Sequence, residues 1–223
     1  MNKTITPLEY WSNVWTEGVI RFHQAQYNSQ MTAYFNQFDL TNKTVLIPLA
    51  GKSKDILYFL ERGAIVTAIE FCEQAVVDFF TENKIKFTKV GNCFKAKNLS
   101  FYACDFFNFH TDTSFDVLYD RASQVVFGKN DRPKYFDHVL NMVTSKSLIL
   151  LFSVDHAGDP DYGPPFKIPK TEIMEAYKNK GITLTEESTT TEVGSEKMQA
   201  AGINTLITFT LKNPNPEITL TQS

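Results

Sequence analysis

Short apolar runs alternate with helix-forming segments along the middle of this chain of 223 residues. Such a run is too short for a helix and is typical of a strand buried on both faces. The strands are expected at Thr44–Leu49, Ala64–Glu70, Phe101–Asp105, Phe115–Tyr119 and Leu148–Val154. Strands that alternate with helices form a mostly parallel sheet with helices on both faces. The pattern therefore predicts a Rossmann-like α/β fold.

The segments that flank these strands complete the expected fold. Helices are expected over residues 53–61, 73–83, 131–143 and 169–179. Ser53 is a good N-cap, and Pro133 lies in a first turn, where proline is tolerated. The Thr-rich segments Thr183–Val193 and Ile203–Lys212 are expected to close the sheet as an antiparallel pair, which makes seven strands.

No linker or repeat divides the chain, so a single domain is expected. Two helices, at Leu8–Glu17 and Gln24–Phe38, precede the first strand. The predicted organisation is a helical N-terminal extension over 1–43, the sheet domain over 44–212, and a disordered tail over 213–223.

Composition disfavours several classes of protein. Lys and Arg number 22 against 25 Asp and Glu, and the net charge of −3 disfavours a nucleic-acid partner. No apolar run approaches the ~18 residues of a membrane helix, and the N-terminus lacks an apolar signal segment. The three cysteines lack the spacing of a zinc or disulfide framework, so no metal is expected. We therefore expect a cytoplasmic protein with no membrane or nucleic-acid partner.

Polar residues at the expected strand ends are candidates for a binding site, because ligands of open parallel sheets bind beyond these ends. Glu70 comes 19 residues after Gly51 and could accept hydrogen bonds from ribose hydroxyls, or it could be a solvated acid. Asp105 could bind an exocyclic amine or cap a turn, and Phe106 could stack on a purine. Arg121 needs a partner at such a position, which could be Asp120, Asp155 or a ligand.

The glycine pattern narrows the choice of cofactor. Dinucleotide sites require GxGxxG and nucleotide triphosphates a P-loop, and the turn at Gly51 has neither. A nucleoside cofactor without phosphates needs only a tight turn, and S-adenosylmethionine is such a cofactor. Its sulfonium cation is compatible with aromatic faces, and the chain holds 19 Phe and 9 Tyr.

Several motifs, in order, resemble the bacterial form of the thiopurine S-methyltransferase family. The motifs are Trp11-x-x-x-Trp15-x-x-Gly18-x-Ile20-x-Phe22-His23-Gln24, Pro48-Leu49-Ala50-Gly51-Lys52-Ser53-x-Asp55, Ile69-Glu70, Asp105-Phe106-Phe107, Tyr119-Asp120-Arg121-Ala122, Asp131-Arg132-x-x-Tyr135 and Gly163-Pro164-Pro165-Phe166. One departure is Ala50, where the family usually has Cys.

The resemblance implies a class I methyltransferase that uses S-adenosylmethionine and a small-molecule thiol and works as a monomer. It implies that the N-terminal extension covers the active site. The positions that it assigns to the cofactor are Trp15, Leu49, Glu70 and Arg121, with Trp11 and Phe22 at the border of the same pocket and Asp105 and Phe106 at the adenine. It also brings Arg121 near the substrate sulfur.

A heteroaromatic thiol is acidic, so transfer of a methyl group to it requires no dedicated general base. Arg121 is the candidate catalytic residue, through electrostatic stabilisation of the thiolate or a hydrogen bond to a ring nitrogen. Phe22, Phe152, Pro165 and Phe166 are candidates for the substrate pocket. The alternatives left open are transfer to selenium or tellurium species, hydrogen sulfide or aliphatic thiols, and a non-catalytic module that binds S-adenosylmethionine.

Overall fold

The computed structural model describes Asn13 and residues 24–213. In that part of the chain, nine strands form one sheet. They are β1 (Thr44–Ile47), β2 (Ile65–Glu70), β3 (Thr88–Val90), β4 (Cys93–Ala96), β5 (Leu99–Ala103), β6 (Val117–Arg121), β7 (Leu148–Asp155), β8 (Thr185–Val193) and β9 (Thr205–Lys212). Their order across the sheet is β3-β4-β5-β2-β1-β6-β7-β9-β8.

The Rossmann-like fold class is confirmed, whereas the expected count of seven strands is wrong. Strands β5, β2, β1, β6 and β7 are parallel, and β8 and β9 form the expected antiparallel pair. The two additional strands, β3 and β4, form a hairpin on the opposite edge. The hairpin turns at Gly91 with φ of 60°, but the three β3 side chains are exposed and only Val90 is apolar, so no apolar run marks this strand.

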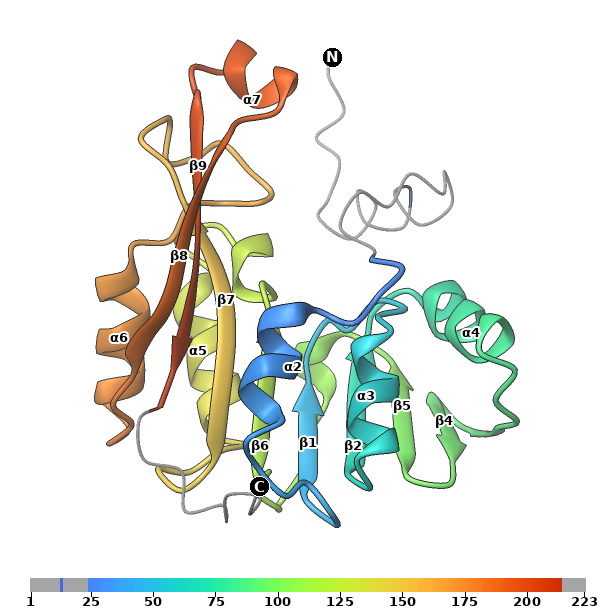
Figure 1. Ribbon diagram of the computed structural model, residues 1–223. Helices are drawn as coiled ribbons and strands as arrows, with labels where there is room; N and C mark the ends of the chain where they lie inside the picture. Colours follow the sequence, from blue (N-terminus) through green and yellow to red (C-terminus); the bar gives the residue numbers. More distant parts are fainter. Residues whose placement is uncertain (1–12, 14–23, 214–223) are drawn as a thin grey trace.

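Helices cover both faces of the sheet, as expected. The helices are α2 (Ser29–Phe35), α3 (Asp55–Glu61), α4 (Glu73–Glu82), α5 (Arg132–Leu140), α6 (Lys170–Lys178) and α7 (Glu196–Ala200), with short 3₁₀ turns η1 (Phe106–Asn108) and η2 (Gln124–Val126). Helices α2, α3 and α4 pack on one face and α5 and α6 on the other, each with its own buried cluster (Figure 1). None of the described helices is long and apolar enough to cross a membrane.

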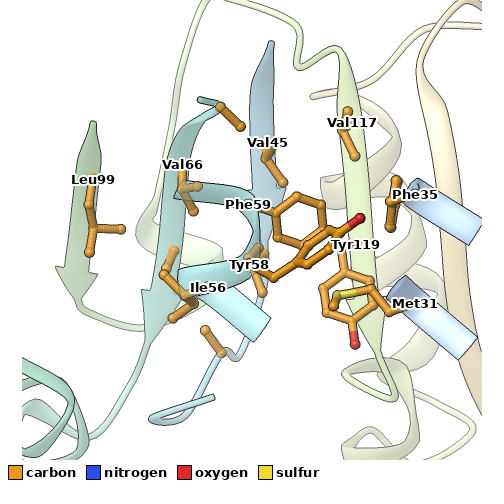
Figure 2. Packing of buried hydrophobic residues seen from close by; sticks show 14 of the residues in the cluster. Met31, Phe35, Val45, Ile56, Tyr58, Phe59, Val66, Leu99, Val117 and Tyr119 are labelled. Atoms are coloured by element: carbon orange, nitrogen blue, oxygen red, sulfur yellow. The ribbon is translucent and has the colours of Figure 1, made fainter. Parts of the chain in front are cut away.

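Helix α2 is part of the packed core. Phe35 is fully buried, and its ring lies 5.0 Å from that of Phe59 on α3 and 6.1 Å from that of Tyr119 on β6. Figure 2 shows these rings between the two helices and the sheet. The helix begins at the cap residue Asn28, whose side chain accepts a hydrogen bond from the backbone N–H of Met31, and it is shorter than the sequence predicts.

The end of the sheet domain lies one residue later than expected. Asn213 was placed at the start of the disordered tail, but it is buried. Its side chain accepts a hydrogen bond from the N–H of Ile149 at 2.8 Å and donates one to the carbonyl of Ser147 at 2.7 Å. In sequence, a polar residue followed by prolines resembles a linker. The structure shows that the Asn213 side chain extends the hydrogen bonding between β9 and β7.

The substitution Phe35→Ala tests the contribution of α2 to the core. A fully buried phenylalanine reduced to alanine leaves a cavity, so we expect a loss of about 3–5 kcal/mol in the free energy of unfolding by urea titration. The control Val193→Ala, on a side chain that is 76% exposed, should change this free energy by less than about 0.5 kcal/mol. Similar small changes in both variants would contradict the assigned packing.

Candidate active site

The turn after β1 and the end of β2 lie side by side. Ile47 is the register partner of Ala68, and Leu49 and Glu70 each come two residues later. These two residues therefore lie at the same edge of the sheet. Leu49 and Gly51 both have positive φ, 45° and 55°, which makes the turn tight. The N–H of Gly51 donates to Glu70 Oε2 at 2.9 Å. Three residues predicted to bind the cofactor are therefore together.

The carboxylate of Glu70 is hydrogen-bonded to the backbone of two loops. Its Oε1 accepts from the N–H of Cys72 at 2.9 Å, while Oε2 is bound to Gly51. Burial raises the pKa of Glu70, and the hydrogen bonds from backbone amides oppose this shift. Each carboxylate oxygen keeps acceptor capacity for a further donor. This arrangement fits an acceptor of ribose hydroxyls and excludes the alternative of a solvated acid.

Asp105 lies at the neighbouring strand end but has a local partner. The N–H of Cys104 donates to the carbonyl of Glu70 at 2.9 Å, which brings the two strand ends together. Asp105 Oδ1 accepts from the N–H of Phe107 at 2.9 Å and caps η1, one of the two roles left open by the sequence. Phe106 is buried, with its ring 5.4 Å from that of Tyr135, so its ring belongs to the core.

Arg121 forms an ion pair with Asp55, which the sequence did not identify as its partner. Its Nη1 lies 3.0 Å from Asp55 Oδ2, and its side chain is 20% exposed. Asp120 and Asp155, which the sequence leaves open as partners beside a ligand, bind other groups. Asp120 accepts from Ser123 and Tyr135, and Asp155 accepts from the N–H of His156. Successive strand residues point to opposite faces, so Asp120 faces away from Arg121.

Asp55 is the site residue that the sequence analysis missed. It is fully buried, and its Oδ2 also accepts from the Tyr119 hydroxyl at 2.7 Å. Its Oδ1 accepts from the N–H of Asn28 at 2.9 Å, just before α2. A signal was present, because Asp55 precedes the apolar Phe59 by four residues and so shares the inward face of α3. An acid on such a face needs a buried partner.

Asp120 stabilises the loop that follows Arg121. Its two oxygens accept from the N–H of Ser123 and the hydroxyl of Tyr135, each at 2.7 Å. The Ser123 hydroxyl donates to the carbonyl of Pro48 at 2.8 Å, and Ala122 has a φ of 61°. The loop after β6 is thus tied to the end of β1, where the strand order reverses.

The candidates for the substrate pocket lie around the end of β7. Phe152 is the register partner of Arg121 on the neighbouring parallel strand, so both side chains leave the same face. The N–H of Phe166 donates to the carbonyl of Val125 at 2.7 Å, and Phe166 and Pro165 are half-buried. A Cβ at Gly163 would lie 2.4 Å from the Phe166 ring, which explains the glycine of this motif.

Three other predicted site residues, Trp11, Trp15 and Phe22, lie outside the described residues. The proposed roles of these three residues stay predictions. Among residues 24–213 and Asn13, no group of three His, Cys, Asp or Glu side chains is placed to hold a metal ion.

Comparison with known proteins identifies the family. The sequence model of the family described as thiopurine S-methyltransferase matches residues 6–209. The chain belongs to the thiopurine S-methyltransferase family. A thiopurine S-methyltransferase of Legionella pneumophila strain Paris is 31% identical over 176 residues, which are 76% of this chain and 80% of that protein. The protein of this name from Photobacterium profundum is 30% identical, over 79% of this chain and 84% of its own length.

Solved structures of methyltransferases share the fold. Magnesium protoporphyrin IX methyltransferase from Synechocystis, with bound S-adenosylmethionine, has a TM-score of 0.60 at 9% identity, and the match covers 96% of this chain and all of that one. The 1,6-didemethyltoxoflavin N1-methyltransferase of Burkholderia thailandensis, with bound S-adenosylhomocysteine, has a TM-score of 0.59 at 15% identity, over 93% of this chain and 87% of that chain. This member of the thiopurine S-methyltransferase family therefore has the class I methyltransferase fold.

The buried Asp120 gives this family member a predictable pH dependence of stability. Burial raises the pKa of Asp120 from 3.8 to about 6. The folded state then binds more protons than the unfolded state between these values, so stability falls as the pH rises from about 4 to about 6. The shift corresponds to at most about 3 kcal/mol.

In Asp120→Asn this ionisation is absent. Urea titrations at pH 4 and pH 7 should show that the wild type loses up to about 3 kcal/mol relative to the variant over this range. Burial also raises the pKa of Glu70, but that group is present in both proteins, so the difference reports on Asp120. Parallel pH profiles of the two proteins would argue against a raised pKa at Asp120.

Proposed function

We propose that this protein transfers the methyl group of S-adenosylmethionine to the thiol of thiopurines or other aromatic or heterocyclic thiols. The proposal is carried by two charged groups at the carboxyl ends of neighbouring strands. The Glu70 carboxylate is held by backbone N–H groups at the end of β2. The Arg121 guanidinium is held by the buried Asp55 at the end of β6. Membership of the thiopurine S-methyltransferase family supports the same reaction.

The turn after β1 and Glu70 fit the nucleoside part of the cofactor. Gly51 and Leu49 provide a tight turn, and the buried Glu70 carboxylate provides acceptors for two ribose hydroxyls. We place Asp105 at the edge of the adenine, with its backbone position set by the cap on η1. Trp11, Trp15 and Phe22 complete the cofactor assignment that we propose from the family resemblance.

The cofactor supplies a methyl group on a sulfonium, so the protein's task is to bind and orient. Holding the acceptor sulfur in line with the methyl group can lower the barrier by about 7–11 kcal/mol. Arg121 stabilises the negative charge on the acceptor sulfur, whether that is a thiolate or the electron-rich sulfur of a thione. The pair with Asp55 keeps the guanidinium oriented before the substrate arrives. Phe152, Pro165 and Phe166 border a flat acceptor, which carries its own acidity and needs no general base.

The cellular setting belongs to the same proposal. Cys72, Cys93 and Cys104 are free thiols, as in proteins of a reducing compartment, and we propose a cytoplasmic enzyme. We also propose that it acts as a monomer on a small molecule and not on nucleic acid, in line with its net charge of −3.

A methyl-transfer assay with labelled cofactor tests the proposal. The acceptors are 6-mercaptopurine, selenite and an aliphatic thiol. We expect transfer to 6-mercaptopurine with the highest kcat/KM. A higher value for selenite or the aliphatic thiol would replace the substrate class, and calorimetric binding of the cofactor without transfer to any acceptor would indicate a binding module.

The substitution Arg121→Ala separates catalysis from cofactor binding. It removes the cation beside the reacting sulfur, so we expect kcat for 6-mercaptopurine to fall by about 100-fold or more. The Kd for S-adenosylhomocysteine should change by less. The control Arg62→Ala removes an arginine that binds Asn36 and the carbonyl of Phe38 away from these strand ends. Equal losses in kcat and cofactor affinity would reduce Arg121 to a part of the cofactor pocket.

The substitution Glu70→Gln tests the ribose contact. The amide keeps the shape of the side chain but replaces one acceptor with a donor, so we expect about 10- to 100-fold weaker binding of S-adenosylhomocysteine by calorimetry. Glu73→Gln, at an exposed carboxylate that pairs with Lys89, is the matched control and should bind normally. Normal affinity in Glu70→Gln would refute the assignment.

A further inference from the structure

Gln124 is a buried polar residue to which the proposed reaction assigns no role. It begins η2, three residues after Arg121, and is 1% exposed. Its Nε2 donates to the backbone carbonyl of Phe152 on β7 at 2.8 Å. Because a carbonyl can only accept, this bond fixes the orientation of the side-chain amide. Oε1 is therefore at the free end of the amide.

Oε1 of Gln124 is buried and accepts no hydrogen bond from the protein. A buried acceptor without a donor is unfavourable, and in native proteins it is commonly matched by a ligand or an ordered water. The described part of the chain holds other buried polar atoms without partners, on Tyr34, His138, Ser153, His156 and Tyr177. Gln124 differs from them because it is bonded directly to Phe152, the strand neighbour of Arg121.

The loop that carries Gln124 is fixed in place. The preceding residue, Ser123, is bonded to the carbonyl of Pro48 and to Asp120. The following residue, Val125, accepts from the N–H of Phe166 at 2.7 Å. The amide therefore has little freedom to turn Oε1 toward another donor, and it is preorganised for a donor that arrives beyond the carboxyl end of β6.

We propose that Gln124 Oε1 accepts a hydrogen bond from the ring N–H of a heteroaromatic thione and thereby selects acceptors whose N–H is adjacent to the C=S group. The adjacent position follows because Gln124 comes three residues after Arg121 and is hydrogen-bonded to Phe152, the register partner of Arg121. This inference rests on the proposed function and narrows its substrate class. Aliphatic thiols, hydrogen sulfide and selenite lack such a donor.

The reaction balances with this assignment. A lone pair of the thione sulfur forms the new bond to the methyl carbon, and the bond from that carbon to the cofactor sulfonium breaks. The electron pair of the broken bond stays on the cofactor sulfur, which becomes a neutral thioether. Methylation gives a protonated S-methyl heterocycle, which loses its ring N–H proton to bulk water after release and becomes neutral. Gln124 increases electron density at the sulfur by accepting from the N–H and takes no proton itself.

Because Oε1 is buried, an acceptor can reach it only if a neighbouring segment moves, and we assign this movement to the segment bonded to η2. The segment 157–167 contains the Gly163–Phe166 motif, and its residues are half-buried or exposed. It is attached at Phe166 to Val125 and at Lys167, whose Nζ donates to the carbonyls of His156 and Gly158, each at 3.1 Å. An acceptor that displaces this cover binds Oε1 away from water, where a hydrogen bond discriminates strongly.

Two isomeric acceptors test the inference. Pyridine-2-thione carries its N–H beside the C=S group, and pyridine-4-thione carries it on the opposite side of the ring. We expect the wild type to show a kcat/KM about 10-fold or more higher for the 2-isomer. In Gln124→Met, which keeps the length of the side chain, this ratio should fall toward one. Gln199→Met, which removes a glutamine bond to the carbonyl of Gly194, should leave the ratio unchanged.

The possible results separate the inference from the proposed function. Equal kcat/KM for the two isomers in the wild type, together with methylation of 6-mercaptopurine, overturns the inference and leaves the function intact. This comparison needs no variant, so it holds even if Gln124→Met does not fold. A preserved isomer ratio in folded Gln124→Met also overturns it. No transfer to any of the three acceptors, while S-adenosylhomocysteine binds, overturns the proposed function and the inference with it.

Discussion

The buried carboxylate of Asp55 holds together the part of the fold on which the site depends. One oxygen binds the backbone before α2, and the other binds Tyr119 and Arg121 on β6. A buried charge is stable only when it is paired and hydrogen-bonded, so these partners must all be in place. The guanidinium at the end of β6 is therefore oriented by the same contact that joins α2 and α3 to the sheet. Its position is a consequence of folding and does not require a ligand.

Three buried acids lie around the site, two at strand ends and one on α3, and each is stabilised differently. Asp55 has a cation, Glu70 has backbone amides from two loops, and Asp120 has a tyrosine hydroxyl and one amide. Without a cation, burial dominates, and the pKa values of Glu70 and Asp120 are raised. The two acids without cations fix the loops after β1, β2 and β6, while the paired acid fixes a side chain. Glu70 and Asp120 thus set the geometry of the loops, and Asp55 sets the position of the Arg121 charge.

Sequence patterns are informative about this protein where a residue acts locally. The runs that form β1, β2 and β7 are mostly apolar, so their burial and parallel pairing could be predicted. Glu70 could be placed opposite the turn at Gly51 because parallel strand ends meet at one edge. The hairpin of β3 and β4 could not be predicted, because its first strand is exposed and has only one apolar residue. A strand on an edge needs no apolar pattern.

Sequence patterns do not predict which distant residues pair with one another. Arg121 was expected to pair with acids near it or one strand away, but its partner Asp55 is 66 positions earlier, on a helix packed against the same face. Likewise, the capping role of Asp105 was open until η1 was seen, and Phe106 was assigned to a ligand although its ring is needed in the core. In each case the deciding quantity is which face of the sheet a side chain occupies, and local spacing does not determine this at a strand end.

The same reasoning explains why an unpaired amide is informative here. The buried acids around the site accept hydrogen bonds from neighbouring groups. The loop after β6 is hydrogen-bonded at Ser123 and at Val125, on both sides of Gln124. The buried charges near the site are paired or hydrogen-bonded, whereas the Gln124 amide oxygen beside Phe152 has no donor. In the proposed reaction this oxygen finds its donor only when the acceptor binds. In the proposed reaction, the charged residues Glu70 and Arg121 therefore position the transfer of the methyl group, and the neutral residue Gln124 selects the acceptor.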